Sequence, residues 1–143
     1  MKKISKHALV PYSASQMYAL VNDIESYAEF LPWCSQSIIL EQTDDEIKAS
    51  LNIAYGSLNK SFTTLNKLTP DSKMEMLLVD GPFKHLQGAW QFTQLGDDGC
   101  KVSLVLEFEF ENKLISMTMG PVFSQIANTL VDSFSERAHK VYK

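Results

Sequence analysis

The longest hydrophobic pattern lies at the end of the chain, over residues 112–142. Apolar side chains recur there every three or four residues, which is the spacing along one face of an α-helix. Asn112 is suited to cap the first turn, and polar residues occupy the opposite face. The pattern predicts one amphipathic helix about 40 Å long, with a kink or a broken first segment at Pro121.

Residues 35–110 follow a different pattern, in which apolar and polar positions alternate. This period of two predicts β-strands, and Gly, Pro and Asp clusters separate them. The expected strands are 37–42, 46–55, 58–68, 74–79, 86–92 and 102–110. Because the connections are short, consecutive strands should pair as an antiparallel meander with one buried face.

The N-terminal residues predict a strand followed by two short helices. The strand covers residues 3–10, and Ser13 and Gln16 have the spacing of a capping box at the start of a first helix. A second helix over residues 24–30 should end before Pro32. We therefore expect a single α+β domain over residues 1–143, in which a curved antiparallel sheet grips the C-terminal helix and the short helices cover one end of the sheet.

Composition narrows the range of functions. The net charge is −4, and Arg137 is the one arginine among 13 basic residues, which argues against a DNA-binding or general nucleic-acid-binding protein. Cys34 and Cys100 are far apart and form no C-x-x-C pair, as is typical of free thiols in a reducing compartment. No apolar run has the length of a signal peptide or a membrane span, so we expect a cytoplasmic protein.

Two stretches carry a resemblance to a known family. The first contains VPYS at residues 10–13, MYALVNDIESY at 17–27 and EFLPWC at 29–34, and the second is GPFKHLQGAWQF at 81–92. They resemble the coenzyme Q-binding START-type family of the polyketide cyclase/START-like superfamily, although Ala89 stands where relatives carry a bulkier or polar residue. The resemblance implies a helix-grip fold with a hydrophobic cavity between the sheet and the C-terminal helix.

Apolar side chains from the last two strands and the final helix are the candidates for lining that cavity. They are Trp90, Phe92, Leu106, Phe108, Met119, Phe123, Ile126, Ala127 and Leu130. The alternative is that they fill the core completely, since ligand pockets and cores have similar composition. Methionines near these positions would let a cavity wall adapt to a flexible ligand.

The segment after the second short helix is a candidate for the rim of the cavity. Phe30, Leu31, Pro32 and Trp33 would form a gate or a lip that touches a membrane surface, with Phe83 on the opposite side. In the alternative interpretation, Trp33 packs over the end of the sheet and Pro32 only stops the helix.

Nothing in the sequence indicates a catalytic or metal site. His7, His85 and His139 are scattered, and Glu107 and Glu109 alternate on the solvated face of a strand. We therefore expect a protein that is not an enzyme, while the cyclase chemistry of the wider superfamily stays an alternative.

The family resemblance implies two functions from different classes. The first is noncatalytic binding of ubiquinone or a related lipid, which supports respiration and requires no other cofactor, with peripheral contact at the inner membrane. The second is binding of the 50S ribosomal subunit, which blocks subunit association. Candidate basic contacts for that role are Lys2, Lys3, Lys6, Lys84, Arg137, Lys140 and Lys143, which gather only if the two termini meet.

Overall fold

The computed structural model describes residues 1–142 and has the expected α+β architecture. Seven strands and a long final helix account for most of the chain, and three short helical segments lie between the first two strands. The elements are β1 (Lys2–Val10), α1 (Ala14–Asn22), the 3-10 turn η1 (Ile24–Ser26), α2 (Tyr27–Phe30), β2 (Cys34–Gln42), β3 (Glu46–Tyr55), β4 (Leu58–Thr69), β5 (Lys73–Asp80), β6 (Phe83–Leu95), β7 (Gly99–Phe110) and α3 (Lys113–Val141).

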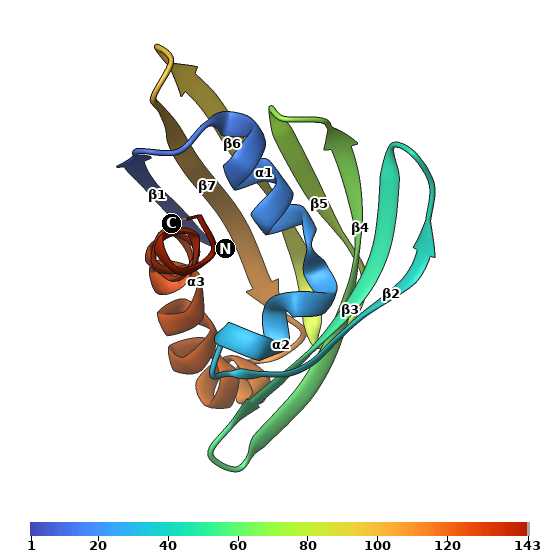
Figure 1. Ribbon diagram of the computed structural model, residues 1–143. Helices are drawn as coiled ribbons and strands as arrows, with labels where there is room; N and C mark the ends of the chain where they lie inside the picture. Colours follow the sequence, from blue (N-terminus) through green and yellow to red (C-terminus); the bar gives the residue numbers. More distant parts are fainter. Residues whose placement is uncertain (143) are drawn as a thin grey trace.

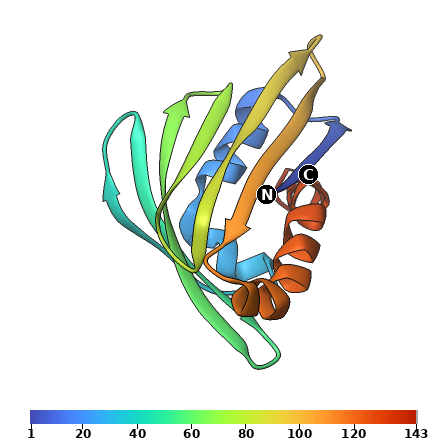
Figure 2. The same cartoon turned by 180° about the vertical axis from the view of Figure 1, so that it is seen from behind.

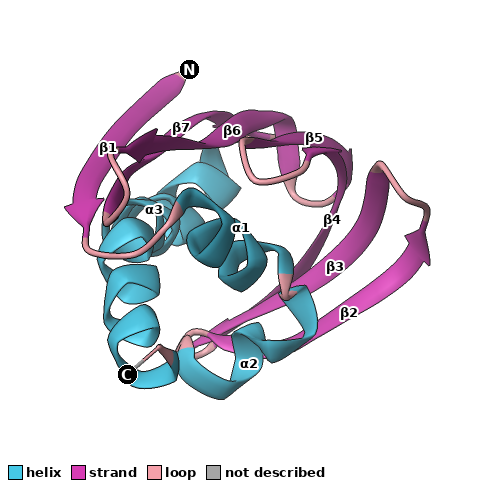
Figure 3. Ribbon diagram, turned by 45° about the horizontal axis from the view of Figure 1, so that its top comes forward, coloured by secondary structure: helices cyan, strands magenta, loops and turns pink. Residues whose placement is uncertain are grey.

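The strands form one antiparallel sheet in the order β1-β7-β6-β5-β4-β3-β2. Strands β2 to β7 form a meander. The last strand, β7, also pairs with the first, β1, so that Lys2 lies opposite Phe108. Figure 3 shows the sheet curling around α1 and α3, which lie inside the curve. The helix-grip prediction is therefore confirmed.

Strand β7 has the clearest alternation of all the strands. Its residues Val102, Leu104, Leu106, Phe108 and Phe110 are all buried. Tyr55 at the end of β3 shares the alternation of that strand and is nevertheless 58% exposed. Alternation decides to which face of the sheet a side chain points. Burial also requires another element that covers that face.

Helix α3 begins where the sequence predicted, because the Asn112 side chain accepts a hydrogen bond from the backbone of Ile115. The expected break at Pro121 is absent, and the helix is continuous over 29 residues. Its first turns lean away from the direction of the rest in Figures 1 and 2. Met119 and Phe123 are buried on either side of Pro121, so packing holds the helix together where proline removes a hydrogen bond.

The N-terminal helices were expected to cover one end of the sheet, and α1 instead lies inside its curve (Figure 3). The capping box of Ser13 and Gln16 is present, and α1 packs against β6, β7 and α3. The Tyr18 ring of α1 meets Phe92 edge to face, with centroids 5.8 Å apart. The predicted second helix is two pieces, η1 and α2. Part of the concave face is therefore covered by α1 rather than by α3.

Candidate functional site: an apolar cavity

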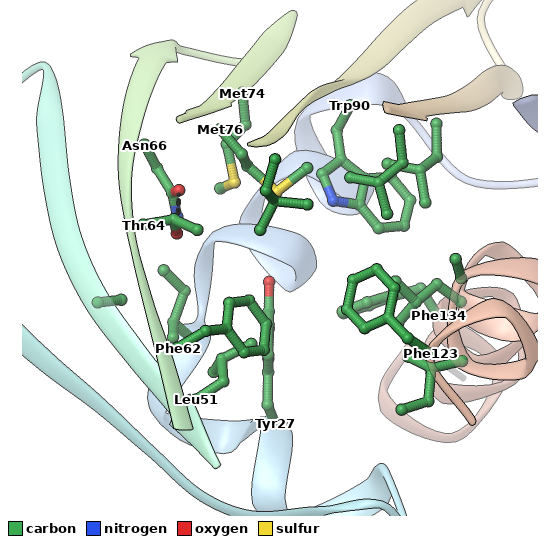
Figure 4. Close-up of a pocket in the computed structure, with 18 of the residues that line it drawn as sticks. Tyr27, Leu51, Phe62, Thr64, Asn66, Met74, Met76, Trp90, Phe123 and Phe134 are labelled. Carbon is green, nitrogen blue, oxygen red and sulfur yellow. Dashed lines mark hydrogen bonds between the residues drawn. The ribbon is translucent and has the colours of Figure 1, made fainter. Parts of the chain in front are cut away.

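A cavity of about 80 Å³ lies between α3 and the concave face of the sheet. Figure 4 shows its side chains converging from the sheet, from α3 and from the segment around Tyr27. The lining residues are Ile24, Tyr27, Trp33, Ala49, Leu51, Phe62, Thr64, Asn66, Met74, Met76, Leu86, Trp90, Leu104, Leu106, Phe123, Ile126, Ala127, Leu130 and Phe134.

Most of these residues are buried, and four are half-buried: Leu51, Phe62, Met76 and Leu130. Leu51 and Phe62 are paired across β3 and β4, whereas Leu130 belongs to α3. The cavity is therefore most accessible where these two strands face the helix.

Seven of the residues singled out from the sequence line this cavity. Trp90 and Leu106 come from the sheet, Trp33 comes from the segment expected at the rim, and the others belong to α3. The α3 residues are Phe123, Ile126, Ala127 and Leu130, which share one face because they are spaced three and four residues apart.

Phe92, Phe108 and Met119 were expected in the lining and lie outside it. All three are buried. Phe92 is covered by Tyr18 of α1, a contact between elements far apart in sequence. Phe108 packs behind Phe123, with ring centroids 4.8 Å apart, and Met119 lies one turn before Phe123 on α3. These side chains belong to the packed core around the cavity.

The expected rim also differs from the structure. Phe30 packs edge to face on Phe134 at 5.3 Å, and the Arg137 guanidinium lies 4.8 Å above its ring. Leu31 is buried away from the cavity and Pro32 is exposed, so neither lines it.

Phe83, the candidate for the opposite lip, is 4% exposed and stacks on Phe110 at 5.0 Å. Its ring also contacts Phe62 and Phe123, which are lining residues. Phe83 therefore supports the cavity wall from behind and forms no lip.

Sequence reasoning missed most of the lining from β3, β4 and β5, as well as Ile24, Tyr27 and Phe134. For β4 a signal was present, since Thr64 and Asn66 alternate with Phe62 and therefore share its face. Because both are polar, they were not among the apolar side chains expected in the lining. The strong curl of the sheet instead brings this strand over the cavity (Figure 3).

Thr64 and Asn66 are the polar pair of the cavity. Thr64 is 9% exposed and Asn66 is 5% exposed. The Thr64 hydroxyl donates a hydrogen bond to Oδ1 of Asn66, over 2.8 Å. Within residues 1–142 the amide of Asn66 makes no second side-chain hydrogen bond, so its Nδ2 is left for another acceptor.

The described lining contains no Asp, Glu, Lys, Arg or His. Its titratable group is the Tyr27 phenol, whose hydroxyl donates to the backbone carbonyl of Val21. Burial raises the pKa of Tyr27 well above its ordinary value, with smaller contributions from Cys34 and Asp23. The cavity is therefore uncharged, and its chemistry is that of an apolar binding site with one amide group.

The volume of the cavity limits the size of the ligand that it can hold unless the lining side chains move. Sites for drug-sized ligands are about 300–1,000 Å³, so 80 Å³ accommodates only part of such a molecule. Met74 and Met76 are flexible lining residues, and small changes in their rotamers would enlarge the space.

The basic residues proposed for a second, external site do not gather at one point, because the two termini lie apart in Figure 3. Lys2 at the start of β1 meets Ser124 of α3, whereas His139 near the end of α3 meets Tyr12, which follows β1. Two of the basic residues are already paired. Lys84 Nζ lies 3.6 Å from Glu109, and Arg137 lies 3.4 Å from Glu29. Lys2 Nζ donates to Ser124 Oγ on α3 over 3.0 Å, and Lys143 lies outside the described residues.

Over residues 1–142, no helix has both the length and the hydrophobicity needed to cross a bilayer.

Curated relatives match the chain over nearly its whole length. The Ribosome association toxin RatA of Pseudomonas aeruginosa is 48% identical over 139 residues, which cover 97% of this chain and 96% of the relative. The Persistence and stress-resistance toxin PasT of Escherichia coli is 49% identical over 142 residues, covering 99% and 90% of the two chains.

More distant similarity extends to a protein named for quinone binding and to an enzyme. The mitochondrial Coenzyme Q-binding protein COQ10 homolog B of Xenopus laevis is 25% identical, over 96% of this chain and 58% of that protein. The crystal structure of the Zhui aromatase/cyclase from Streptomyces sp. R1128 shares the fold, with a TM-score of 0.88 at 14% identity, over 99% of this chain and 96% of the other.

The family profile covers the site as well as the fold. The profile described as polyketide cyclase/dehydrase and lipid transport matches residues 10–135, which include every residue that lines the cavity. The chain belongs to this polyketide cyclase/dehydrase and lipid transport family.

Proposed function

We propose that this protein is a ribosome-associating toxin of the type for which its relatives are named. The observation that carries the proposal is near-50% identity along the whole chain to proteins called RatA and PasT. The target would be the 50S subunit, and the consequence would be fewer joined ribosomes.

The charge distribution suggests where ribosome contact would occur. The protein is acidic overall, so a contact with RNA would depend on a local basic surface. Lys3 and Lys6 on β1 and Lys140 at the end of α3 are exposed, and no ion pair engages them within residues 1–142. These three lysines, which we call the terminal lysines, are the best candidates.

The test is sedimentation of the purified protein with isolated 50S and 30S subunits through sucrose gradients. The protein should comigrate with 50S subunits, and it should lower the yield of 70S particles when the subunits are mixed. Failure to bind either subunit and failure to reduce 70S formation would contradict the proposal.

Charge reversal tests the terminal lysines separately. The triple variant K3E/K6E/K140E should bind 50S subunits at least about tenfold more weakly and with a shallower dependence on salt, since contacts with phosphates release counterions. Undiminished binding by this variant would exclude the terminal lysines as the contact surface.

A matched control for that variant is K48E/K60E/K67E, which makes the same change in net charge on β3 and β4. It should retain binding within about twofold, because surface charges away from a contact have small effects. An equal loss in both variants would show an effect of net charge alone.

A second function is supported by the cavity itself. We propose that the protein binds an apolar ligand such as ubiquinone without transforming it. The cavity is lined almost entirely by apolar side chains, and it contains one buried polar pair. Burial of apolar ligand surface contributes about 25 cal/mol per Å², so a few hundred Å² is sufficient for useful affinity.

The test is native mass spectrometry of protein mixed with decylubiquinone, a quinone with a short tail. The L130W variant should take up less quinone, because Leu130 lies at the accessible side of the cavity. The L114W variant is the matched control, since Leu114 is 71% exposed near the start of the same helix. Equal uptake by both variants, or no uptake by the natural protein, would contradict ligand binding in this cavity.

A further inference from the structure

Asn66 is the one side chain in the cavity that presents an unused amide group. It lies on β4 between Ile47 of β3 and Met76 of β5, its partners in the two adjacent strands. With 5% exposure it is nine-tenths buried, and Thr64 occupies only its Oδ1. Figure 4 shows both side chains among the apolar residues of the lining.

An amide in such a place is costly unless it gains a partner. A donor enclosed in the protein without a hydrogen bond loses the interactions that it makes with water in the unfolded chain. An apolar side chain at this position would avoid this cost. The Nδ2 of Asn66 is a donor, so the partner that would remove the cost is an acceptor oxygen on a bound molecule.

The surroundings restrict the charge of that molecule. A carboxylate or phosphate in the cavity would require a cation, and the described lining offers no Lys, Arg or His. The Tyr27 hydroxyl already donates to Val21, so its proton is also engaged. An uncharged acceptor is the only kind that Asn66 alone can satisfy.

We propose that the cavity selects uncharged apolar molecules that carry a carbonyl oxygen, and that Nδ2 of Asn66 donates a hydrogen bond to this oxygen. Ketones and quinones fit this description, whereas fatty acids in their ionised form do not. The inference rests on the proposed binding of an apolar ligand and adds the chemical group by which the ligand is recognised.

The two tryptophans provide a direct readout. Trp33 and Trp90 are the only tryptophans in the sequence, and both line the cavity. Their fluorescence should therefore change when the cavity fills. Titrations with 2-undecanone and with undecanoate at pH 8 compare two eleven-carbon probes that differ in the group at one end.

The natural protein should bind 2-undecanone at least about a hundredfold more tightly than undecanoate, since an unpaired carboxylate is expensive to bury. This comparison needs no variant and is therefore independent of any folding defect. Equal or tighter binding of undecanoate would overturn the proposed selectivity.

The N66L variant tests the hydrogen bond. It should bind 2-undecanone about tenfold more weakly than the natural protein, the usual consequence of one lost hydrogen bond. The matched control is N128L, because Asn128 is an exposed amide on α3 that bonds to Ser124. This control should leave the affinity unchanged.

The outcomes separate this inference from the function on which it rests. Undiminished ketone binding by a folded N66L variant would remove Asn66 from recognition and leave apolar capture intact. If N66L does not fold, the proposal is tested by the selectivity of the natural protein, and equal or tighter binding of undecanoate than of 2-undecanone would overturn it. No fluorescence change with either probe, confirmed by calorimetry, would overturn both the selectivity and the use of the cavity for such ligands.

Discussion

The ring of Phe134 on α3 meets the indole of Trp90 on β6 edge to face, with centroids 5.3 Å apart. Phe134 also contacts Tyr27 and Phe30, so one side chain joins the long helix, the sheet and the short helical segment. Phe134 is 1% exposed, and its contacts hold α3 against the sheet.

Truncation at this residue should be severe. The F134A variant should lose about 3–5 kcal/mol of unfolding free energy, from lost burial and the cavity left behind. Urea unfolding followed by circular dichroism would measure this. The L114A variant, at a 71% exposed position of the same helix, should change stability by less than about 0.5 kcal/mol. Similar effects of the two substitutions would contradict this account of the packing.

Gly88 should tolerate no side chain at the centre of the sheet. A Cβ there would lie 2.5 Å from the carbonyl oxygen of Val105 and 2.7 Å from Cδ1 of Leu106, a lining residue. The G88A variant should lose about 2–3 kcal/mol by overpacking. G56A is the comparison, because Gly56 has a φ of +61° and no atom within 4 Å of an added Cβ. It should lose only about 1 kcal/mol. A milder effect at Gly88 than at Gly56 would contradict the close approach.

Tyr27 should make stability depend on alkaline pH. Its pKa is raised in the folded protein by burial, whereas the unfolded chain ionises it near pH 10. Below pH 10 both states hold the proton, and above it the unfolded state loses the proton first, so stability falls as pH rises. Ionisation of Tyr27 in the unfolded chain alone lowers the free energy of unfolding by up to about 1.4 kcal/mol per pH unit.

The measurement for Tyr27 is urea unfolding between pH 9 and pH 11.5. The Y27F variant should be less stable at neutral pH, because it loses the hydrogen bond to Val21. Above pH 10 its stability should decline less steeply than that of the natural protein. Parallel curves would show that Tyr27 is not the group responsible.

The two thiols should be inert in the folded protein. Cys34 and Cys100 are free and buried, and burial raises the pKa of both. Since the thiolate is the reactive form, alkylation by iodoacetamide at pH 7.5 should be very slow until the protein unfolds. Mass spectrometry should then show two added groups in urea. Rapid labelling of either cysteine without urea would contradict its burial.

Much of the fold follows from local patterns. The strict alternation in residues 102–110 and the helical stripe after Asn112 each require a particular periodicity, and each was correctly predicted. The caps at Ser13 and Asn112 involve residues three apart, so their hydrogen bonds are encoded locally.

The boundaries of the cavity were less predictable, because they depend on which elements cover which faces. Phe92 has the same alternation as Trp90, yet Tyr18 covers it from a helix more than 70 residues earlier. Asn66 belongs to a strand with many polar residues, and the curl of the sheet buries it.

Local residue patterns were enough for the elements and for the antiparallel meander, since these depend on periodicity, caps and turn residues within short segments. The family was recognised separately, from the resemblance of residues 10–34 and 81–92. The sequence left three features open that depend on the folded chain: α1 shares the concave face with α3, Phe83 and Phe108 support the cavity wall, and Asn66 faces the cavity. Such contacts join residues far apart in the chain, and their geometry is set by the twist and closure of the whole sheet rather than by any local preference.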